Sequence, residues 1–308
     1  MQPLRLGLVG YGKIAQDQHV PAILANPAYQ LCAVATLGDP CPGVENYDSL
    51  RAMLEHCPNL DAVAFCTPPQ GRYAQVRGAL LAGKHVLVEK PPCASLGEAM
   101  ALTELASERG LSCLFAWHSR FAPAVASAQA WLAQRSVLAV TVQWKEDVRK
   151  WHPGQQWIWQ PGGLGVFDPG INALSIVTHL LEQPLFVKSA ELRVPSNRQA
   201  PIAASVRMTD SHDLAVHAEF DWGHVGDELW RIDVRCADGT LRLDHGGASL
   251  SLDGQALPVD EEAEYPALYR HFAQLIRDGA SDTDLQPLRL VADAFFTGSR
   301  TVVEPFND

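Results

Sequence analysis

The residues best suited to chemistry stand where an apolar run meets two charged side chains. Val86-Leu87-Val88 is followed directly by Glu89, Lys90 and the pair Pro91-Pro92. Buried parallel strands read as continuous Val, Leu and Ile, and proline cannot continue a strand. In open α/β sheets, ligands bind outside the carboxyl ends of the strands. The stretch is therefore consistent with a Lys90 that projects into a binding crevice. An ordinary surface lysine at a strand end is the alternative, and this stretch alone favours neither.

A glycine-rich turn near the start of the chain is typical of dinucleotide binding. An apolar run over residues 4–9 is followed by Gly10-Tyr11-Gly12-Lys13-Ile14-Ala15. In this motif the first glycine permits a tight turn, the second lets the backbone approach a pyrophosphate, and the small third residue lets helix and strand pack closely. Glycine turns of this kind also close plain βα units, so the prediction depends on the elements that follow.

Those elements predict a doubly wound parallel sheet, because apolar runs alternate with helical segments. We assign this α/β, Rossmann-type dinucleotide-binding domain to residues 1–120. Its predicted strands are 4–9, 31–35, 62–66, 86–90 and 112–116, and its predicted helices include 73–82 and 96–109.

The second half of the chain has a different pattern of apolar and polar residues. Residues 138–144 alternate apolar and polar side chains, as expected for an antiparallel strand with one exposed face. We predict an α+β domain with a large, mostly antiparallel sheet over residues 121–308, which binds substrate and, through its exposed sheet face, forms a homodimer or a higher homo-oligomer. The other predicted strands are 187–194, 203–209, 214–221, 230–236 and 239–244, and the predicted helices are 122–133, 265–278 and 287–303.

The end of the second predicted strand bears on which dinucleotide binds. An acidic residue there accepts a hydrogen bond from the ribose of NAD, whereas an arginine meets the extra phosphate of NADP. This chain has Thr36-Leu37-Gly38-Asp39, with neither residue at the usual position. Thr36 can hydrogen-bond to a ribose hydroxyl or a phosphate, but no cation stands next to it in the sequence. We therefore expect NAD to be favoured slightly over NADP, with use of both as the alternative.

The most unusual stretch, residues 145–174, combines tryptophans with polar side chains. Aromatic faces suit the C–H faces of a sugar, and a buried sugar needs a hydrogen-bonding partner for each hydroxyl. We interpret Trp151 and His152, which lie beside a charged triplet and a Pro-Gly turn, as substrate contacts. For Trp157 and Trp159 we favour packing in the core.

Asp168 and Asn172 are four residues apart at the start of a predicted helix, with Pro169 at its first position. This spacing places both side chains on one face of the helix. Capping of the helix alone would explain an Asp before Pro, so capping is the alternative to a catalytic role for Asp168.

The bulk properties exclude several classes of function. The chain has 308 residues, a net charge of −11 and no basic run, so we expect neither nucleic acid nor an anionic membrane as a partner. The seven cysteines are odd in number and never spaced as CxxC, which indicates reduced thiols in a cytoplasmic protein. The N-terminus runs directly into a predicted strand, so we expect no signal peptide. Scattered histidines give no metal-binding motif, so we expect no metal.

Together these segments resemble the glucose–fructose oxidoreductase/inositol dehydrogenase (Gfo/Idh/MocA) family over the whole chain. The motifs that carry the resemblance are Gly10-x-Gly12-x-x-Ala15, Thr67-Pro68, Glu89-Lys90-Pro91 and Gly162-Gly163 leading to Asp168. The family pattern has a histidine four residues after that aspartate, where this chain has Asn172. With His118 and the Trp151-His152 pair, this departure is similar to bacterial aldose 1-dehydrogenases acting on D-galactose and L-arabinose.

The resemblance implies hydride transfer from C1 of a pyranose to NAD or NADP, which yields a lactone. Lys90 would be the base for the C1 hydroxyl, because burial beside a cationic nicotinamide favours its neutral amine. Asp168 would orient Lys90 or share the proton with it, and Glu89 would meet the nicotinamide ribose. Implied substrate contacts are His118, Glu146, Trp151, His152 and Asn172; implied cofactor contacts are Gly10, Gly12, Lys13, Ile14, Thr36, Thr67, Pro68, Glu89 and Lys90.

Besides a redox glycosidase of the same fold, which would leave the cofactor unchanged at the end, two alternative functions stay open at this point. One is an inositol or other polyol dehydrogenase of the same family, against which Asn172 counts because it cannot act as an acid or base. The other is a non-catalytic regulator that binds a dinucleotide and a sugar, against which the lysine at the strand end counts.

Overall fold

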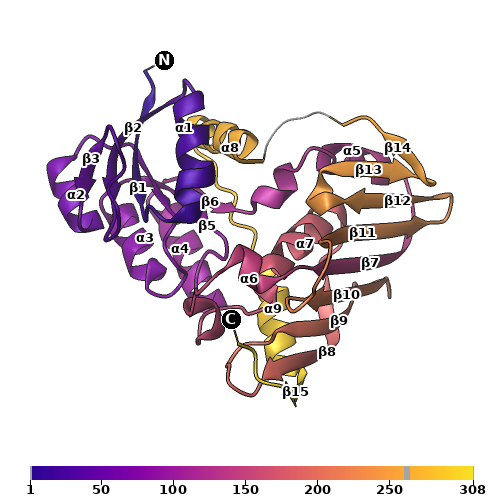
Figure 1. Cartoon of the computed structure of the whole chain (residues 1–308). Coiled ribbons are helices and arrows are strands. Elements are labelled where there is room, and N and C mark those ends of the chain that lie inside the picture. The colour runs from indigo at the N-terminus through magenta and orange to yellow at the C-terminus, as the bar shows by residue number, and fades with distance from the viewer. Residues whose placement is uncertain (1, 260–263, 308) are drawn as a thin grey trace. The chain divides into compact units, whose positions relative to one another are not determined.

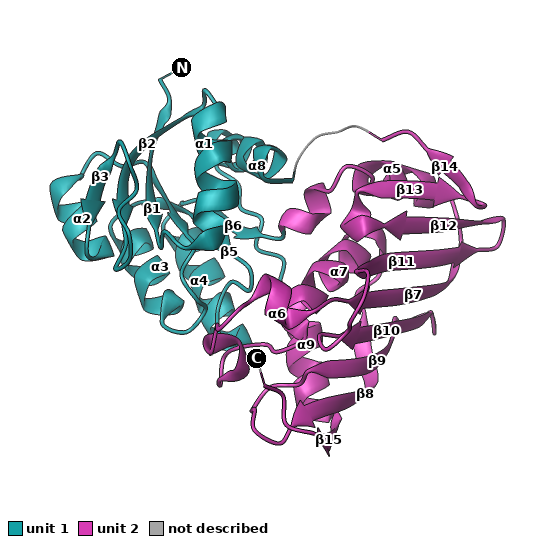
Figure 2. Cartoon of the chain, in the orientation of Figure 1, with its two compact units in different colours: residues 1–117, 264–285 teal, residues 118–263, 286–308 magenta. Residues whose placement is uncertain are grey.

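The computed structural model describes residues 2–259 and 264–307, and the chain divides into two compact units (Figures 1 and 2). Unit 1 comprises residues 1–117 and 264–285, and unit 2 comprises residues 118–263 and 286–308. The sequence predicts two contiguous domains divided at residue 120. The division differs because the late helix α8 (Glu264–Asp278) packs against α1 (Val20–Ala25) of the first unit.

Unit 1 contains a six-stranded parallel sheet in the order β3-β2-β1-β4-β5-β6, which confirms the predicted Rossmann-type fold. Its strands are β1 (Leu4–Val9), β2 (Tyr29–Ala35), β3 (Glu45–Tyr47), β4 (Ala62–Phe65), β5 (His85–Glu89) and β6 (Cys113–Ala116). Besides α1 and α8, its helices are the π-helical turn η1 (Ala15–His19), α2 (Leu50–His56), α3 (Arg72–Leu81) and α4 (Leu96–Glu108).

The central strands of unit 1 are apolar because the sheet is covered on both faces. Every residue of β4 is buried, as are Val86, Leu87 and Val88 of β5. The apolar runs in the sequence therefore predicted these strands correctly. The sequence analysis missed β3 and α2, although Ser49, whose hydroxyl accepts from the N–H of Ala52, is an ordinary N-cap signal.

Unit 2 contains a nine-stranded mixed sheet in the order β14-β13-β12-β11-β7-β10-β9-β8-β15. Two neighbouring pairs, β7 with β10 and β8 with β15, are parallel, and the other pairs are antiparallel. The strands are β7 (Val137–Lys145), β8 (Phe186–Pro195), β9 (Ala203–Thr209), β10 (Ala215–Asp221), β11 (Leu229–Cys236), β12 (Gly239–Asp244), β13 (Ser249–Leu252), β14 (Gln255–Leu257) and β15 (Ser299–Val303).

Helices cover one face of this sheet, as Figure 1 shows for α5, α7 and α9. On β7 the side chains of Val140, Val142 and Trp144 are buried, while Thr141 on the opposite face is exposed. The alternation read from the sequence is therefore correct. The helices are α5 (Val125–Leu132), α6 (Val148–Trp151), α7 (Phe167–Leu180) and α9 (Gln286–Thr297), with short 3₁₀ turns η2 (His118–Phe121), η3 (Trp157–Trp159) and η4 (His245–Gly247).

The predicted helix over residues 287–303 is wrong in its last part. The helix α9 ends at Thr297, and Ser299–Val303 forms β15, which pairs with β8. Gly298 separates the two, and a Cβ there would lie 2.4 Å from the carbonyl oxygen of Ala294. The β-branched residues that follow favour an extended strand.

Candidate functional site

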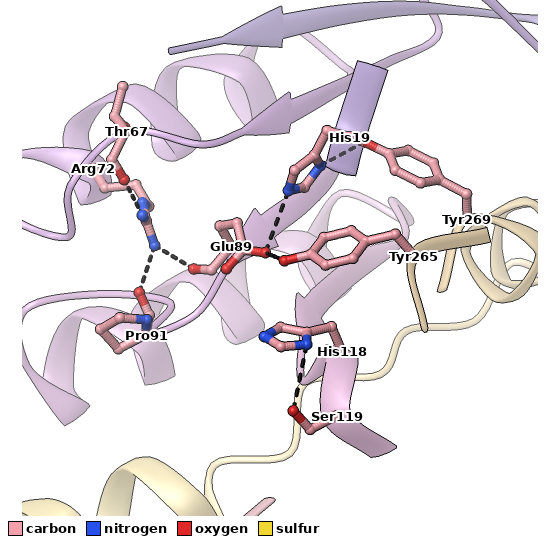
Figure 3. Close-up of polar contacts among 9 residues, drawn as sticks. All are labelled: His19, Thr67, Arg72, Glu89, Pro91, His118, Ser119, Tyr265 and Tyr269. Carbon is pink, nitrogen blue, oxygen red and sulfur yellow. Dashed lines mark hydrogen bonds and ion pairs between the residues drawn. The ribbon is translucent and has the colours of Figure 1, made fainter. Parts of the chain in front are cut away.

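Lys90 directly follows the carboxyl end of β5. In the sheet, β5 lies between the central strand β4 and the edge strand β6. The side chain of Lys90 is half-buried, and the Lys90–Pro91 peptide bond is cis. Arg72 holds the backbone on both sides of Lys90. Its guanidinium donates hydrogen bonds to the carbonyl oxygens of Glu89, Pro91 and Thr67 (Figure 3). Because one buried guanidinium fixes three carbonyl groups, Lys90 stands on a rigid backbone.

The side chain of Glu89 lies inside unit 1, where it is only 3% exposed. Its Oε1 accepts a hydrogen bond from the Tyr265 hydroxyl at 2.6 Å and lies 3.3 Å from Nε2 of His19. The other ring nitrogen of His19 lies 2.8 Å from the Tyr269 hydroxyl. Figure 3 shows these side chains converging on the end of β5 from η1 and α8. The expected contact between Glu89 and the nicotinamide ribose stays a prediction.

The charges around His19 decide its protonation. Burial alone lowers the pKa of His19, but Cys66 and Glu89 raise it, and the result is a pKa of about 9. Of these two partners Glu89 is the carboxylate, and its Oε1 contacts the imidazole directly. Burial also raises the pKa of Tyr265, so this phenol stays protonated and donates to Glu89. The structure therefore contains a buried ion pair directly before Lys90.

A pocket of about 750 Å³ lies at the carboxyl ends of β1 and β2. Gly10 forms part of its wall, with φ +90°, and a Cβ there would lie 2.9 Å from the backbone nitrogen of Thr67. Only glycine fits this close approach, as the dinucleotide motif requires. The rest of the lining includes Val9, Ala35, Thr36, Leu37, Asp48, Ser49, Leu50, Arg51, Leu54, Glu55, Thr67, Ala74, Gln75 and Gly78. The pocket is large enough to admit the adenosine half of a dinucleotide, and its lining offers both apolar and hydroxyl groups.

The pocket changes the interpretation of Thr36. No cation follows Thr36 in the sequence, but Arg51 of α2 lines the same pocket. Its Nε donates to Oε1 of Glu55 at 2.8 Å, and its side chain is 87% exposed. An arginine can therefore reach the pocket that Thr36 lines. Of the other predicted cofactor residues, Lys13 forms an exposed ion pair with Asp17.

In unit 2, Asp168 is 2% exposed, and its Oδ2 lies 3.3 Å from Nε2 of His152. The alternative in which Asp168 caps a helix beginning at Pro169 is wrong, because α7 begins at Phe167 and Val166 occupies the cap position. Pro169 is tolerated inside this first turn, where backbone N–H groups have no helical partner. The carboxylate of Asp168 is thus available to His152.

Glu146 holds two tryptophans of unit 2. It is 5% exposed, and its Oε1 and Oε2 accept from the indole nitrogens of Trp222 at 3.1 Å and Trp230 at 2.8 Å. Trp222 packs edge-on against the His152 ring, with ring centroids 5.2 Å apart. Trp151 lies against Trp230 with centroids 5.6 Å apart. Glu146, Trp151 and His152 therefore belong to one cluster, and their expected contacts with a sugar stay predictions.

The remaining residues of the predicted substrate site are His118 and Asn172. Asn172 lies one helical turn after Asp168 on α7 and is half-buried. His118 begins η2, and its Nδ1 lies 3.4 Å from the Ser119 hydroxyl. Trp159 is 4% exposed, which confirms core packing. Trp157 is only half-buried, so core packing is wrong for that residue.

The sequence analysis missed several residues that hold the site together. Arg72, His19 and Tyr265 fix the Glu89-Lys90 segment, while Gln155 and Trp222 contact His152. No local pattern marks them, because each acts through a contact distant in sequence. Within the ranges 2–259 and 264–307, no helix is long and apolar enough to cross a bilayer. The same ranges contain no group of three or more potential metal ligands.

Comparison with known proteins agrees with this architecture. A family model described as "Oxidoreductase family, NAD-binding Rossmann fold" matches residues 4–116. The chain is 67% identical, over 100% of both chains, to a protein named galactose 1-dehydrogenase from Pseudomonas fluorescens. It is 26% identical to scyllo-inositol 2-dehydrogenase (NAD(+)) from Bacillus subtilis, over 90% of this chain and 87% of that protein.

Solved structures extend the comparison to the whole fold. The crystal structure of the D-galactose-1-dehydrogenase protein from Rhizobium etli matches with a TM-score of 0.95 at 52% identity, covering 100% of this chain and 99% of that one. KijD10, a 3-ketoreductase from Actinomadura kijaniata, has a TM-score of 0.87 at 21% identity, over 98% and 99% of the chains, and shares the fold. The chain therefore belongs to the Gfo/Idh/MocA oxidoreductase family with an NAD-binding Rossmann fold.

Proposed function

We propose that the protein is an NAD(P)-dependent aldose 1-dehydrogenase that oxidises C1 of D-galactose, L-arabinose or both to the corresponding lactone. The observation that carries this proposal is the position of Lys90 at the end of β5, where Arg72 holds the backbone on both sides of it. The chain is also 67% identical to a protein named galactose 1-dehydrogenase. Lactone formation from a cyclic aldose removes a hydride from C1 and a proton from its hydroxyl.

Side chains of the protein accept the proton that leaves the C1 hydroxyl. A bound nicotinamide supplies the acceptor for the hydride. Lys90 takes the hydroxyl proton, and Asp168 orients Lys90 or shares the proton with it. Asn172 cannot titrate, so it positions sugar hydroxyls, together with His118 and the cluster of Glu146, Trp151 and His152. A homodimer is the assembly that we propose, through the exposed face of the unit 2 sheet.

The two proposed sugars present nearly the same groups to a binding site. D-Galactose and L-arabinose have the same ring configuration from C1 to C4 and differ by the C6 hydroxymethyl group. Recognition of such a group discriminates by only about 1–3 kcal/mol, so we expect both sugars to be oxidised. D-Glucose should react poorly because its C4 hydroxyl points the other way. Rates of nicotinamide reduction with these three sugars test the prediction, and equal rates with glucose and galactose would refute it.

For the cofactor, we propose NAD as the favoured dinucleotide, with Arg51 allowing use of NADP. Asp at position 36 would accept from the NAD ribose and repel a phosphate. Thr36→Asp should therefore leave the Kd of NAD⁺ nearly unchanged and weaken NADP⁺ binding at least tenfold, measured by calorimetry. Arg51→Gln is the matched variant, and it should also weaken only NADP⁺ binding. Equal losses for both dinucleotides in Thr36→Asp would show that Thr36 is not at the ribose.

A polyol dehydrogenase of the same family is the second candidate function. The similarity to scyllo-inositol 2-dehydrogenase favours it, at 26% identity. Adding inositols to the sugar panel separates the two candidates. A regulator without catalysis would bind dinucleotide and sugar but reduce no cofactor with any of these compounds.

A further inference from the structure

The chain has no acidic residue at the end of β2, where one would accept a hydrogen bond from the adenosine ribose of NAD. Thr36 occupies that position, and its Oγ1 accepts the backbone N–H of Gly38 at 3.1 Å. The threonine hydroxyl has one hydrogen to donate, and it can donate to a ribose oxygen or to a phosphate oxygen. Thr36 therefore does not by itself distinguish NAD from NADP.

The neighbouring strand β3 brings a carboxylate to the same edge of the sheet. β3 lies next to β2 and runs parallel to it, with Tyr47 opposite Ala35 (Figure 1). The backbone N–H of Thr36 donates to the carbonyl oxygen of Tyr47 at 2.9 Å. Asp48 follows Tyr47 directly, so it leaves β3 beside the point at which Thr36 leaves β2. Both Thr36 and Asp48 line the pocket of about 750 Å³.

Ser49 holds the carboxylate of Asp48 in place. Its hydroxyl donates to Oδ1 of Asp48 at 3.0 Å and accepts the backbone N–H of Ala52 at 3.3 Å. A carboxylate has about four lone-pair sites, so Asp48 can accept from a ligand hydroxyl while it keeps its contact with Ser49. Because Asp48 is exposed, a ligand in the pocket can reach it.

The charged side chains in the lining of this pocket carry more negative than positive charge. They are Asp48, Arg51 and Glu55, and Nε of Arg51 donates to Oε1 of Glu55 at 2.8 Å. A ribose hydroxyl can donate to a carboxylate, whereas the 2′-phosphate of NADP offers only acceptor oxygens and negative charge. A carboxylate at position 48 therefore favours the dinucleotide with a free 2′-hydroxyl.

We propose that Asp48 recognises the 2′-hydroxyl of the adenosine ribose, and that β3 thereby supplies the acid that the end of β2 lacks. The inference rests on the use of a dinucleotide in the proposed function and deepens it, because it assigns the preference for NAD to one side chain. Arg51 acts against this preference, since its guanidinium attracts the phosphate that Asp48 repels. The ratio of the two affinities then depends on both residues.

Calorimetric titration of the purified protein with NAD⁺ and with NADP⁺ tests this assignment without measuring activity. Asp48→Ala removes both the acceptor and the charge, so it should weaken NAD⁺ binding about tenfold and leave NADP⁺ binding equal or tighter. Asp48→Asn keeps an acceptor oxygen and removes the charge, so it should cost less NAD⁺ affinity and tighten NADP⁺ binding. An unchanged ratio of the two Kd values in these variants would overturn the inference.

An NAD⁺ analogue without the 2′-hydroxyl of its adenosine ribose locates the contact. The wild type should bind this analogue about tenfold more weakly than NAD⁺, because Asp48 loses its donor. Asp48→Ala should bind the analogue and NAD⁺ with nearly equal Kd values, since the hydroxyl then has no carboxylate to meet. A penalty for the missing hydroxyl that is as large in Asp48→Ala as in the wild type would overturn the assignment.

Asp39→Ala is the matched control for charge. Asp39 is an exposed carboxylate that follows β2, and within the part of the chain that the structure describes it does not line the pocket. Its loss changes the net charge by the same amount as Asp48→Ala and should leave both Kd values unchanged. A shift in Asp39→Ala equal to that in Asp48→Ala would show that overall charge, rather than a contact of Asp48, sets the preference.

The outcomes separate this inference from the proposed function. A wild type that reduces a dinucleotide with galactose, with the same ratio of Kd values in Asp48→Ala, would overturn the inference alone. A wild type that shows the predicted dependence of NAD⁺ binding on Asp48 but oxidises no aldose would overturn the proposed function alone.

Discussion

Replacing Lys90 by alanine should lower kcat by about 10²–10⁴-fold and change the KM for sugar much less. The reason is that a positioned general base typically contributes this factor, and its loss removes an interaction made mainly in the transition state. The half-buried Lys90 follows β5, and Arg72 holds the backbone on both sides of it. The substitution therefore removes the amine and leaves this backbone in place. Steady-state rates at saturating sugar and dinucleotide measure the effect.

Two further variants make this result interpretable. Lys90→Arg keeps the positive charge but offers no neutral amine, because a guanidinium does not deprotonate in proteins, so it should be nearly as inactive as alanine. Lys188→Ala removes an exposed lysine on β8 and should retain full activity. A Lys90→Ala enzyme with a kcat within a few-fold of the wild type would show that Lys90 is not the base.

Replacing Glu89 by leucine should destabilise the protein by about 3 kcal/mol near pH 6.5, because it leaves the buried His19 without its partner carboxylate. The pKa of His19 is raised to about 9 in the folded state by Cys66 together with Glu89, so Glu89 supplies part of this shift. A raised pKa contributes stability that is fully present below the ordinary value of about 6.5 and is lost as pH rises through about 9. The cost of Glu89→Leu should therefore shrink between these two pH values.

Urea unfolding at pH 6.5 and pH 9 measures both quantities. Tyr265→Phe is the matched control, since it removes one hydrogen bond to Glu89 and keeps the ion pair. It should cost about 1–3 kcal/mol at both pH values. The account of this ion pair fails if Glu89→Leu unfolds at the same urea concentration as the wild type at pH 6.5.

Local patterns were enough to predict the parallel sheet of unit 1 and most strands of unit 2. Apolar runs such as Val86-Leu87-Val88 are buried on both faces, and the alternation on β7 matches one buried and one exposed face. Such patterns carry no information on contacts distant in sequence. The helix α8 joins unit 1 from residue 264, and Tyr265 reaches Glu89 across 176 residues.

In the candidate site too, the sequence predicted the residues that a local motif marks and missed the contacts that join distant segments. Motifs placed Gly10 in the wall of the pocket and Lys90 after β5, because each motif is a local backbone requirement. The pairing of Asp168 with His152 joins a helix to a preceding loop, and only folding brings them together. Arg51 also escaped notice, since it reaches the pocket from a helix that the sequence analysis did not predict.

The most direct test of the proposed activity is reduction of the dinucleotide by the purified protein in the presence of D-galactose. The absorbance of reduced nicotinamide should rise with NAD⁺, NADP⁺ or both, and the sugar should be recovered as its lactone. The same mixture with Lys90→Ala should show almost no rise. Absence of reduction with D-galactose and with L-arabinose, for either dinucleotide, would contradict the account.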